Sequence, residues 1–229
     1  MRGTWTTLNA LSRKVPQMST STAPQVWLDH VVVGIDDLDR GIASFEAMTG
    51  VRPQYCGEHP ALGTHNALAS LGPGRYLEIL AARPGASVDE RFADVVGCTT
   101  LTPVMWALAT DNVNEIQRRI TAAGFNADAP APGSRVTPDG DTVRWSMFMM
   151  QDGLPANAPF FTGWEPTTRH PSATSPEGCS AGDLLVSSPD AAELERLLDT
   201  IGFSMSVGPG QKGLAMLLDT PKGAVKLGA

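Results

Sequence analysis

In the first quarter of the chain, the spacing of the hydrophobic residues changes from the pattern of a β-strand to that of a helix and then back to that of strands. An apolar, β-branched run that opens at Trp27 predicts a strand. A segment with helical period follows, begun by Asp36-Asp37 and ended by Gly50. Strand-like runs come next, and the last two meet at Gly72-Pro73-Gly74. The pattern therefore predicts a β-α-β-β-β unit. The apolar face of its helix is formed by Leu38, Ile42, Phe45 and Met48.

The same order of elements returns twice further along the chain. The second pass consists of a strand at 104–109, a helix ended by Gly124, an alternating run at 142–150 and a closing strand at 159–164. The third consists of a strand at 183–186, a helix at 189–201 and strands at 213–218 and 223–227. Units of this length are too long for a solenoid repeat, so we expect them to pair as modules.

Helices and antiparallel strands are segregated within each unit, so the fold class is α+β. We predict a flexible N-terminal extension at 1–24, a domain of two units (27–82 and 103–165) spanning 25–175, and a third unit at 176–229. The extension contains no acidic residue and is rich in Ser and Thr. A transit peptide and an upstream start codon, with Met18 as the true start, are the alternatives.

The bulk composition excludes several classes of function. The 229 residues are 42% hydrophobic and carry a net charge of −7, so no basic stripe for nucleic-acid binding is expected. No apolar run reaches the ~20 residues of a membrane-spanning helix. Three cysteines without a CxxC pair favour a reducing compartment, and we expect a cytoplasmic protein.

Two ionisable residues lie inside otherwise apolar strands of the first unit. His30 is in the first strand and Glu78 is in the last, between Leu77 and Ile79. Such groups are costly in a strand unless they are paired, exposed or bound to a metal. A solvated face explains either residue alone, but the two together suggest a shared site.

Four sequence segments carry a resemblance to a known family. They are LDHVVVGIDDLD, EHPALGTHNALASLG, YLEILA and PFFTGWE followed by RHP. With tandem β-α-β-β-β units, they resemble the glyoxalase-like domain family of the vicinal oxygen chelate superfamily, which includes glyoxalase I, bleomycin-resistance proteins and extradiol dioxygenases. The resemblance covers residues 28–171 well and the third unit by topology only. It implies that two modules wrap into a half-open barrel with the site in its concave cup.

Metal-dependent members of the superfamily place ligands on the first and last strands of each module. His30 and Glu78 match two of these positions and suit Zn²⁺, Ni²⁺, Mn²⁺ or Fe²⁺. The corresponding positions of the second module hold Trp106 and Thr162 or a neighbour of Thr162, and neither is a convincing metal ligand. Because two protein ligands make a weak site, this departure puts a bound metal in doubt.

Further site residues depend on the register of the hairpin at Gly72-Pro73-Gly74. A three-residue loop pairs Leu68 with Glu78 and places Asn66 on the face of Glu78, with His65 on the other face. A two-residue turn reverses this assignment. The resemblance favours Asn66 as the substrate-binding residue in the cup, because Gly-Thr-x-Asn-x-Leu resembles the family's sequence and His65 lies at its variable position. His59 is expected at the rim of the cup, and His170 lies either at the rim or in a surface turn.

The second unit is predicted to supply the shape of the pocket. Trp106, Phe161 and Trp164 are the expected substrate-binding aromatics, and the alternative is that they form the core between sheet and helices. Arg144, the cation of its strand, either anchors a substrate carboxylate or is solvated. Further wall candidates are Trp145, Met147, Phe148, Met149 and Met150.

Three functions remain open at this point. The first is a metal-assisted lyase, isomerase or dioxygenase acting on a small molecule with vicinal oxygens, with Glu78 as ligand or base and His30 as ligand. The second is a binding protein that sequesters a small molecule, as bleomycin-resistance proteins do. The third is a metal-free acid–base enzyme that uses Glu78. The unpaired third unit packs on the first two or pairs with its copy in a homodimer.

Overall fold

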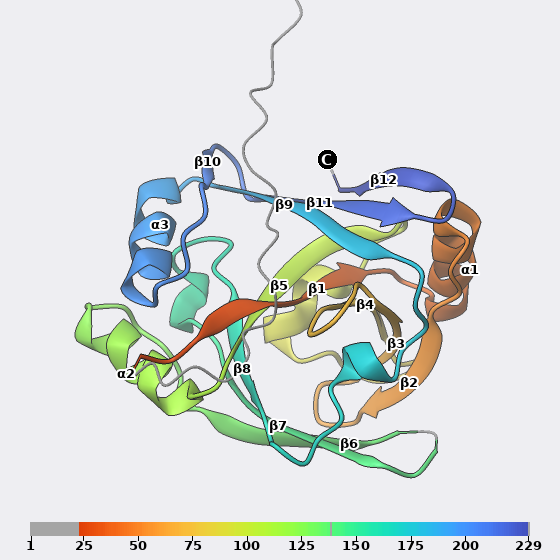
Figure 1. Ribbon diagram of the computed structural model, residues 1–229, viewed down its shortest axis with the longest axis horizontal. Helices are drawn as coiled ribbons and strands as arrows, with labels where there is room; N and C mark the ends of the chain where they lie inside the picture. The colour runs from red at the N-terminus through yellow and green to blue at the C-terminus, as the bar shows by residue number, and fades with distance from the viewer. Residues whose placement is uncertain (1–22, 138, 229) are drawn as a thin grey trace, which may run out of the picture.

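The computed structural model describes residues 23–137 and 139–228 (Figure 1). The extension predicted at 1–24 therefore lies almost entirely outside the described residues. The first unit has the predicted order of one helix among four strands. Its elements are β1 (Val26–Gly34), α1 (Leu38–Thr49), β2 (Gln54–His59), β3 (Thr64–Ser70) and β4 (Tyr76–Ala82).

Local sequence signals account for the ends of α1. The side chain of Asp37 accepts a hydrogen bond from the backbone N–H of Arg40, which caps the first turn. Gly50 ends the helix in the left-handed conformation with φ of 82°, which glycine adopts without steric cost. Between the two caps, Ile42 and Phe45 are buried against the sheet.

The second unit repeats this order with longer connections. Its helix α2 is capped by the side chain of Asn112, which accepts from the backbone N–H of Glu115. Its main elements are β5 (Thr102–Thr110), α2 (Val113–Ala122), β6 (Ala131–Val136), β7 (Thr142–Phe148) and β8 (Phe160–Trp164). Short 3₁₀ helices accompany these elements: η1 (Glu90–Val95) precedes β5, η2 (Gln151–Gly153) lies between β7 and β8, and η3 (Pro171–Ala173) follows β8.

In the described part of the chain, the two units share one eight-stranded sheet in the order β2-β3-β4-β1-β5-β8-β7-β6. The first strands of the units, β1 and β5, pair antiparallel at its centre, and each pairs parallel with the last strand of its own unit. The sheet curves until its edges meet, where Arg135 of β6 donates to the carbonyl oxygen of Cys56 in β2, 2.6 Å away. The predicted α+β class and half-open barrel are thus confirmed.

The third unit has the same element order but a different strand order. Its elements are β9 (Ser180–Ser188), α3 (Ala191–Thr200), β10 (Gly208–Pro209), β11 (Gly213–Thr220) and β12 (Gly223–Leu227). These strands form a separate sheet in the order β10-β9-β11-β12, so β9 lies inside the sheet and pairs antiparallel with β11. The final strand therefore does not return beside the first, as it does in the other two units.

The third unit packs on the convex side of the large sheet, where its blue strands cross between α1 and α3 (Figure 1). Leu184 and Met216 of its sheet join a single buried cluster with Val31 of β1 and Trp106 of β5. Trp106 is fully buried, and its indole N–H donates to the carbonyl oxygen of Asn157 at 2.9 Å. The apolar face of the third unit is therefore covered within the chain.

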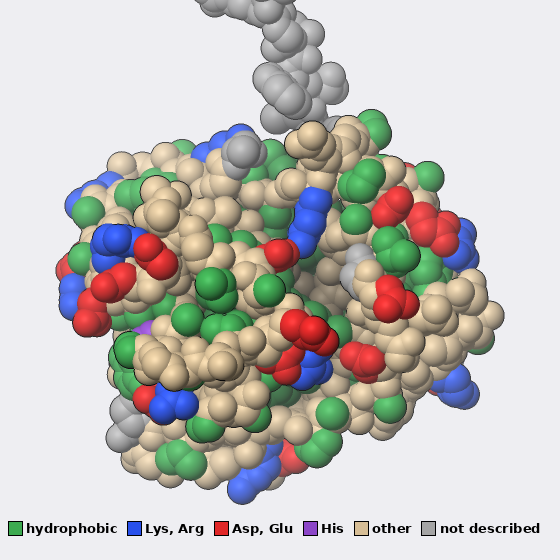
Figure 2. Space-filling view, turned by 180° about the vertical axis from the view of Figure 1, so that it is seen from behind, with side chains coloured by type: hydrophobic (Ala, Val, Ile, Leu, Met, Phe, Trp, Pro, Cys, Tyr) green, Lys and Arg blue, Asp and Glu red, His purple; other side chains and the backbone are tan. Residues whose placement is uncertain are grey.

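The charged side chains of both signs are mixed on the surface. On the face seen in Figure 2, Lys and Arg are scattered among Asp and Glu and form no continuous basic surface. Over residues 23–137 and 139–228, no helix combines the length and apolar character needed to cross a membrane.

Candidate active site

The concave side of the large sheet encloses a pocket of about 70 Å³, which is called the cup below. The volume is enough for a few water molecules or a small polar group. Strands from both units line it. Its polar side chains are His30, His59, Thr64, Asn66, Tyr76, Glu78, Arg135 and Thr162, and its apolar wall is formed by Leu62, Leu80, Phe92, Trp145, Met147, Phe160 and Trp164.

A β-bulge in β1 brings Asp29 and His30 together. The register with β5 shifts between Leu28 and His30, so Asp29 is an extra residue without a direct partner. A bulge interrupts the strict alternation of side chains along a strand. As a result, the carboxylate of Asp29 reaches the ring of its neighbour, with Oδ2 2.7 Å from Nδ1 of His30.

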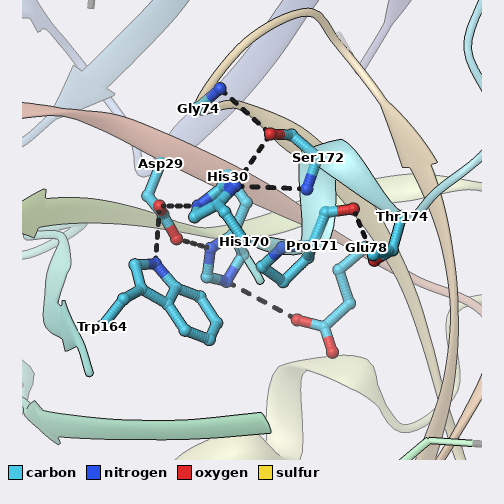
Figure 3. Close-up of polar contacts among 9 residues, drawn as sticks. All are labelled: Asp29, His30, Gly74, Glu78, Trp164, His170, Pro171, Ser172 and Thr174. Atoms are coloured by element: carbon cyan, nitrogen blue, oxygen red, sulfur yellow. Dashed lines mark hydrogen bonds and ion pairs between the residues drawn. The ribbon is translucent and has the colours of Figure 1, made fainter. Parts of the chain in front are cut away.

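Asp29 is fully buried and accepts three hydrogen bonds (Figure 3). Its Oδ2 accepts from His30, and its Oδ1 accepts from Trp164 Nε1 at 3.0 Å and from His170 Nε2 at 2.9 Å. Burial alone would raise the pKa of this carboxyl, but the hydrogen bonds and charges of His170 and His30 lower it to about 2. Asp29 is therefore an ionised carboxylate at neutral pH.

The ionised Asp29 determines which nitrogen of His30 carries its proton. Because a carboxylate only accepts, the proton of neutral His30 lies on Nδ1 and the lone pair of Nε2 faces the cup. Nε2 is 3.6 Å from Oε2 of Glu78, which is nine-tenths buried. A proton bound at Nε2 of His30 or at Oε2 of Glu78 therefore lies between an imidazole nitrogen and a carboxylate oxygen.

The tautomer of His170 follows from its other partner. The backbone N–H of Ser172 donates to Nδ1 of His170 at 3.2 Å, which makes Nδ1 an acceptor. Nε2 must then carry the proton that is donated to Asp29. His170 is the N-cap residue of η3, so the chain that follows β8 supplies one of the hydrogen bonds to the buried carboxylate of Asp29 (Figure 3).

Asn66 binds the other oxygen of Glu78. Its Nδ2 donates to Oε1 at 2.6 Å, and the observed register pairs Leu68 with Glu78, which confirms the three-residue reading of the hairpin. His65 points away from the cup. Oδ1 of Asn66 is buried and has no hydrogen-bond partner among the described residues. An unsatisfied buried acceptor of this kind is costly unless a ligand supplies a donor.

Two more groups of the cup hold defined protonation states. His59 lines the cup with Nδ1 3.1 Å from the hydroxyl of Thr64, and burial lowers the pKa of its imidazole. Tyr76 stacks on His30 with ring centroids 4.4 Å apart. Burial, together with the charges of Asp29 and Glu78, raises the pKa of the Tyr76 phenol well above its ordinary value. Both rings are therefore neutral at neutral pH.

Three of the predicted substrate-binding residues, Trp106, Arg144 and Phe161, do not line the cup. Trp106 and Phe161 are fully buried in the core on the convex side. Ala107, rather than Trp106, pairs with His30 and therefore lies on the same face of the sheet as His30. Arg144 is exposed on the outer face of β7, while its neighbour Trp145 faces inward. These placements follow strand alternation, since the neighbouring residues Trp145, Phe160 and Thr162 line the cup in place of Arg144 and Phe161.

Sequence reasoning missed three important side chains. Asp29 was overlooked because regular alternation places it on the opposite face from His30, and no sequence signal marks the bulge. Tyr76 and Arg135 were not considered. Arg135 was discoverable as the other cation of the hairpin that contains Arg144, since β6 pairs Ser134 with Arg144.

The cup does not fit a resident metal ion. A buried carboxylate on Nδ1 of His30 is an arrangement that metal-bound histidines share. Catalytic zinc sites, however, commonly use three protein ligands. No group of three or more His, Cys, Asp or Glu side chains suited to a metal occurs among the described residues. At the positions where the second unit would supply ligands, Ala107 lies opposite His30 in the sheet and Thr162 presents a neutral hydroxyl group to the cup.

Comparisons with known proteins agree with this architecture. The sequence profile of the glyoxalase-like domain matches residues 28–202. No curated protein shows significant similarity to the chain. A hypothetical protein from Staphylococcus aureus has a TM-score of 0.59 at 17% identity, with 89% of this chain and 86% of that chain covered. At such identity the likeness concerns the fold alone.

Two epimerase structures are more distant. Methylmalonyl-CoA epimerase from Streptomyces coelicolor is 19% identical with a TM-score of 0.44, and 60% of this chain and 96% of that chain are covered. The enzyme from Mycobacterium tuberculosis is 21% identical with the same TM-score, and 66% and 93% are covered.

Proposed function

Because the chain belongs to the glyoxalase-like domain family, whose fold encloses the cup, we propose that it is an acid–base enzyme for a small molecule. His30 is the principal base, and Glu78 is the second proton-transfer group. The observation that carries the proposal is the continuous chain from Asp29 through His30 to Glu78. A fully buried carboxylate fixes Nδ1, and the free Nε2 faces a carboxylate 3.6 Å away.

The polar groups of the cup favour a substrate with two adjacent oxygens. Oδ1 of Asn66 needs a donor, which a hydroxyl group supplies. Arg135 lines the cup and offers N–H groups beyond the one bound to Cys56, and these suit a carbonyl oxygen that becomes negative. An α-hydroxy ketone or aldehyde carries both groups on neighbouring carbons.

The reaction is a proton transfer at the carbon that bears the hydroxyl group. Nε2 of His30 takes the proton, and the electron pair of the C–H bond forms a C=C bond while the carbonyl oxygen becomes an enediolate oxygen beside Arg135. The proton then returns from His30, directly or by way of Glu78, to the same carbon, which exchanges it with solvent. If it is added to the former carbonyl carbon instead, the proton of the original hydroxyl group moves to the enediolate oxygen, and the substrate is isomerised. No atom or electron is lost, and no redox partner is needed.

Lewis-acid chemistry of the kind known in this superfamily is not part of the proposal, because the conventional ligands that line the cup, His30, His59 and Glu78, do not form a group that could hold a metal ion. Metal analysis of the purified protein, with His30→Ala and Glu78→Ala as variants, tests this point directly. If the wild type holds stoichiometric metal and both variants lose it, then His30 and Glu78 bind a metal ion and the metal-free proposal is wrong.

Deuterium exchange tests the proposed activity. The protein is incubated in D₂O with a panel of α-hydroxy ketones, and deuterium at the hydroxyl-bearing carbon is followed by NMR. We expect exchange by the wild type and by Arg144→Ala, and its loss in His30→Gln and Glu78→Gln. If calorimetry shows that a compound of the panel binds and NMR shows no exchange with it, the enzyme proposal is overturned in favour of a binding protein.

A further inference from the structure

A second cavity of about 640 Å³ adjoins the cup, and it is called the outer groove below. The two share five lining residues: His59, Leu62, Phe92, Trp145 and Met147. Shared lining residues mean that the two cavities are adjacent, so the groove lies beside any molecule seated in the cup. The groove is far larger than the cup, and its volume is within the roughly 300–1,000 Å³ typical of ligand sites.

The chemistry of the groove differs from that of the cup. Its wall includes Pro60, Ala131, Pro132, Phe148 and Met149 in addition to the shared residues. Unbranched methionine side chains adapt to apolar ligands of varied shape. The groove therefore presents a hydrophobic surface next to a polar site.

The charged groups of the groove already have partners. Arg91 donates to both carboxylate oxygens of Asp89, at 2.9 and 2.8 Å. Asp128 accepts a hydrogen bond from the side chain of Gln151. Neither group needs a charged ligand for its own satisfaction, so the groove favours an uncharged, apolar occupant.

We propose that the substrate has two parts: the α-hydroxy carbonyl end lies in the cup, and a hydrophobic tail of carbon atoms lies in the outer groove along Trp145 and Met147. This inference rests on the proposed function, and it defines the substrate class as hydrophobic α-hydroxy ketones or aldehydes. Small sugars and their phosphates, which have no apolar tail, are poor occupants of this pair of cavities.

A homologous series of ligands tests the tail site. Dissociation constants are measured by calorimetry for 1-hydroxy-2-butanone, 1-hydroxy-2-hexanone and 1-hydroxy-2-octanone. Burial of each CH₂ contributes about 0.8 kcal/mol, so we expect Kd to fall about fourfold per added carbon in the wild type.

Two substitutions fill the groove from its exposed side. Ala131 and Ala129 are exposed residues of the groove wall, so Ala131→Trp and Ala129→Trp reduce its volume without burying a new group in the core. Both should abolish the dependence of Kd on chain length while leaving the Kd of the butanone within about twofold. Ala224→Trp is the matched control, because Ala224 is an exposed strand residue outside the groove. Circular dichroism establishes that each variant is folded.

The outcomes separate this inference from the proposed function. Equal Kd values for the three ketones in the wild type, or a chain-length dependence that survives both groove substitutions, overturns the tail site. Deuterium exchange with 1-hydroxy-2-butanone would still support the enzyme in that case. Chain-length-dependent binding without exchange keeps the tail site and overturns the enzyme. Failure of all three ketones to bind overturns both.

Discussion

Asp29 and His30 are neighbours in the sequence, yet their side chains form a hydrogen bond of 2.7 Å across a bulge in strand β1. In a regular strand the two side chains would point to opposite faces of the sheet. The extra residue removes this separation, and the buried carboxylate of Asp29 then orients the base that faces the cup. The bulge is therefore the local feature on which the proposed chemistry depends.

Asp29→Asn should reduce the rate of deuterium exchange by about a hundredfold or more. An amide oxygen accepts more weakly than a carboxylate, so His30 loses both its orientation and the charge that stabilises its protonated form. The rate is measured by NMR on protein shown to be folded by circular dichroism. A rate within twofold of the wild type would remove Asp29 from the proposed machinery.

Asp29 should also make stability depend on pH in the acid range. Its pKa is about 2 in the folded protein against an ordinary value of 3.8, so between these values the unfolded state binds more protons. The free energy of unfolding should therefore fall as the pH drops from 4 to 2, by about 2 kcal/mol for this group. Urea unfolding at several pH values should show a correspondingly flatter profile for Asp29→Asn. Equal profiles would contradict the prediction.

Arg135 and Arg144 offer a matched pair of cations on one hairpin. Arg135→Ala removes the hydrogen bond to the carbonyl oxygen of Cys56, where the edges of the sheet meet, and it removes a cation from the cup. We therefore expect the free energy of unfolding to fall by about 1–3 kcal/mol and most of the exchange activity to be lost. Arg144→Ala should stay within about 0.5 kcal/mol with activity unchanged. Thermal unfolding and exchange assays compare the two. Similar effects of both substitutions would refute the placement of Arg135 in the site.

Trp106→Phe tests the assignment of that side chain to the core. The substitution leaves the carbonyl oxygen of Asn157 without its indole donor, so stability should fall by about 1–3 kcal/mol. Ketone binding should be unaffected, since Trp106 does not line the cup. Trp164→Phe, which removes a hydrogen bond to Asp29, should instead impair exchange. Weakened ketone binding in Trp106→Phe would return that residue to the site.

Gly133→Ala should alter the wall between the cup and the outer groove. A Cβ atom at Gly133 would lie 2.5 Å from the indole of Trp145, so the ring must move. Because Trp145 lines both cavities, we expect the substitution to weaken the binding of the octanone more than it weakens the binding of the butanone. Calorimetry measures the Kd of each ketone. Equal changes in Kd for both ketones would show that the position of Trp145 does not affect binding of the tail.

The sequence by itself determined the order of the elements. Helix caps at Asp37 and Gly50 and alternation in the strands are local signals, because each depends on residues a few positions apart. The pairing of Leu68 with Glu78 was also predictable, since the length of a hairpin loop sets the register of its strands. From that register, Asn66 was correctly placed beside Glu78.

Only the tertiary structure decided which faces meet and which strands adjoin. The bulge at Asp29, the register of β5 that pairs Ala107 rather than Trp106 with His30, and the position of β9 inside its sheet depend on pairing between distant segments. A shift of one residue in such a pairing reverses every side chain of a strand. The sequence therefore indicated His30 and Glu78, whereas the carboxylate that orients His30 became evident only in the folded chain.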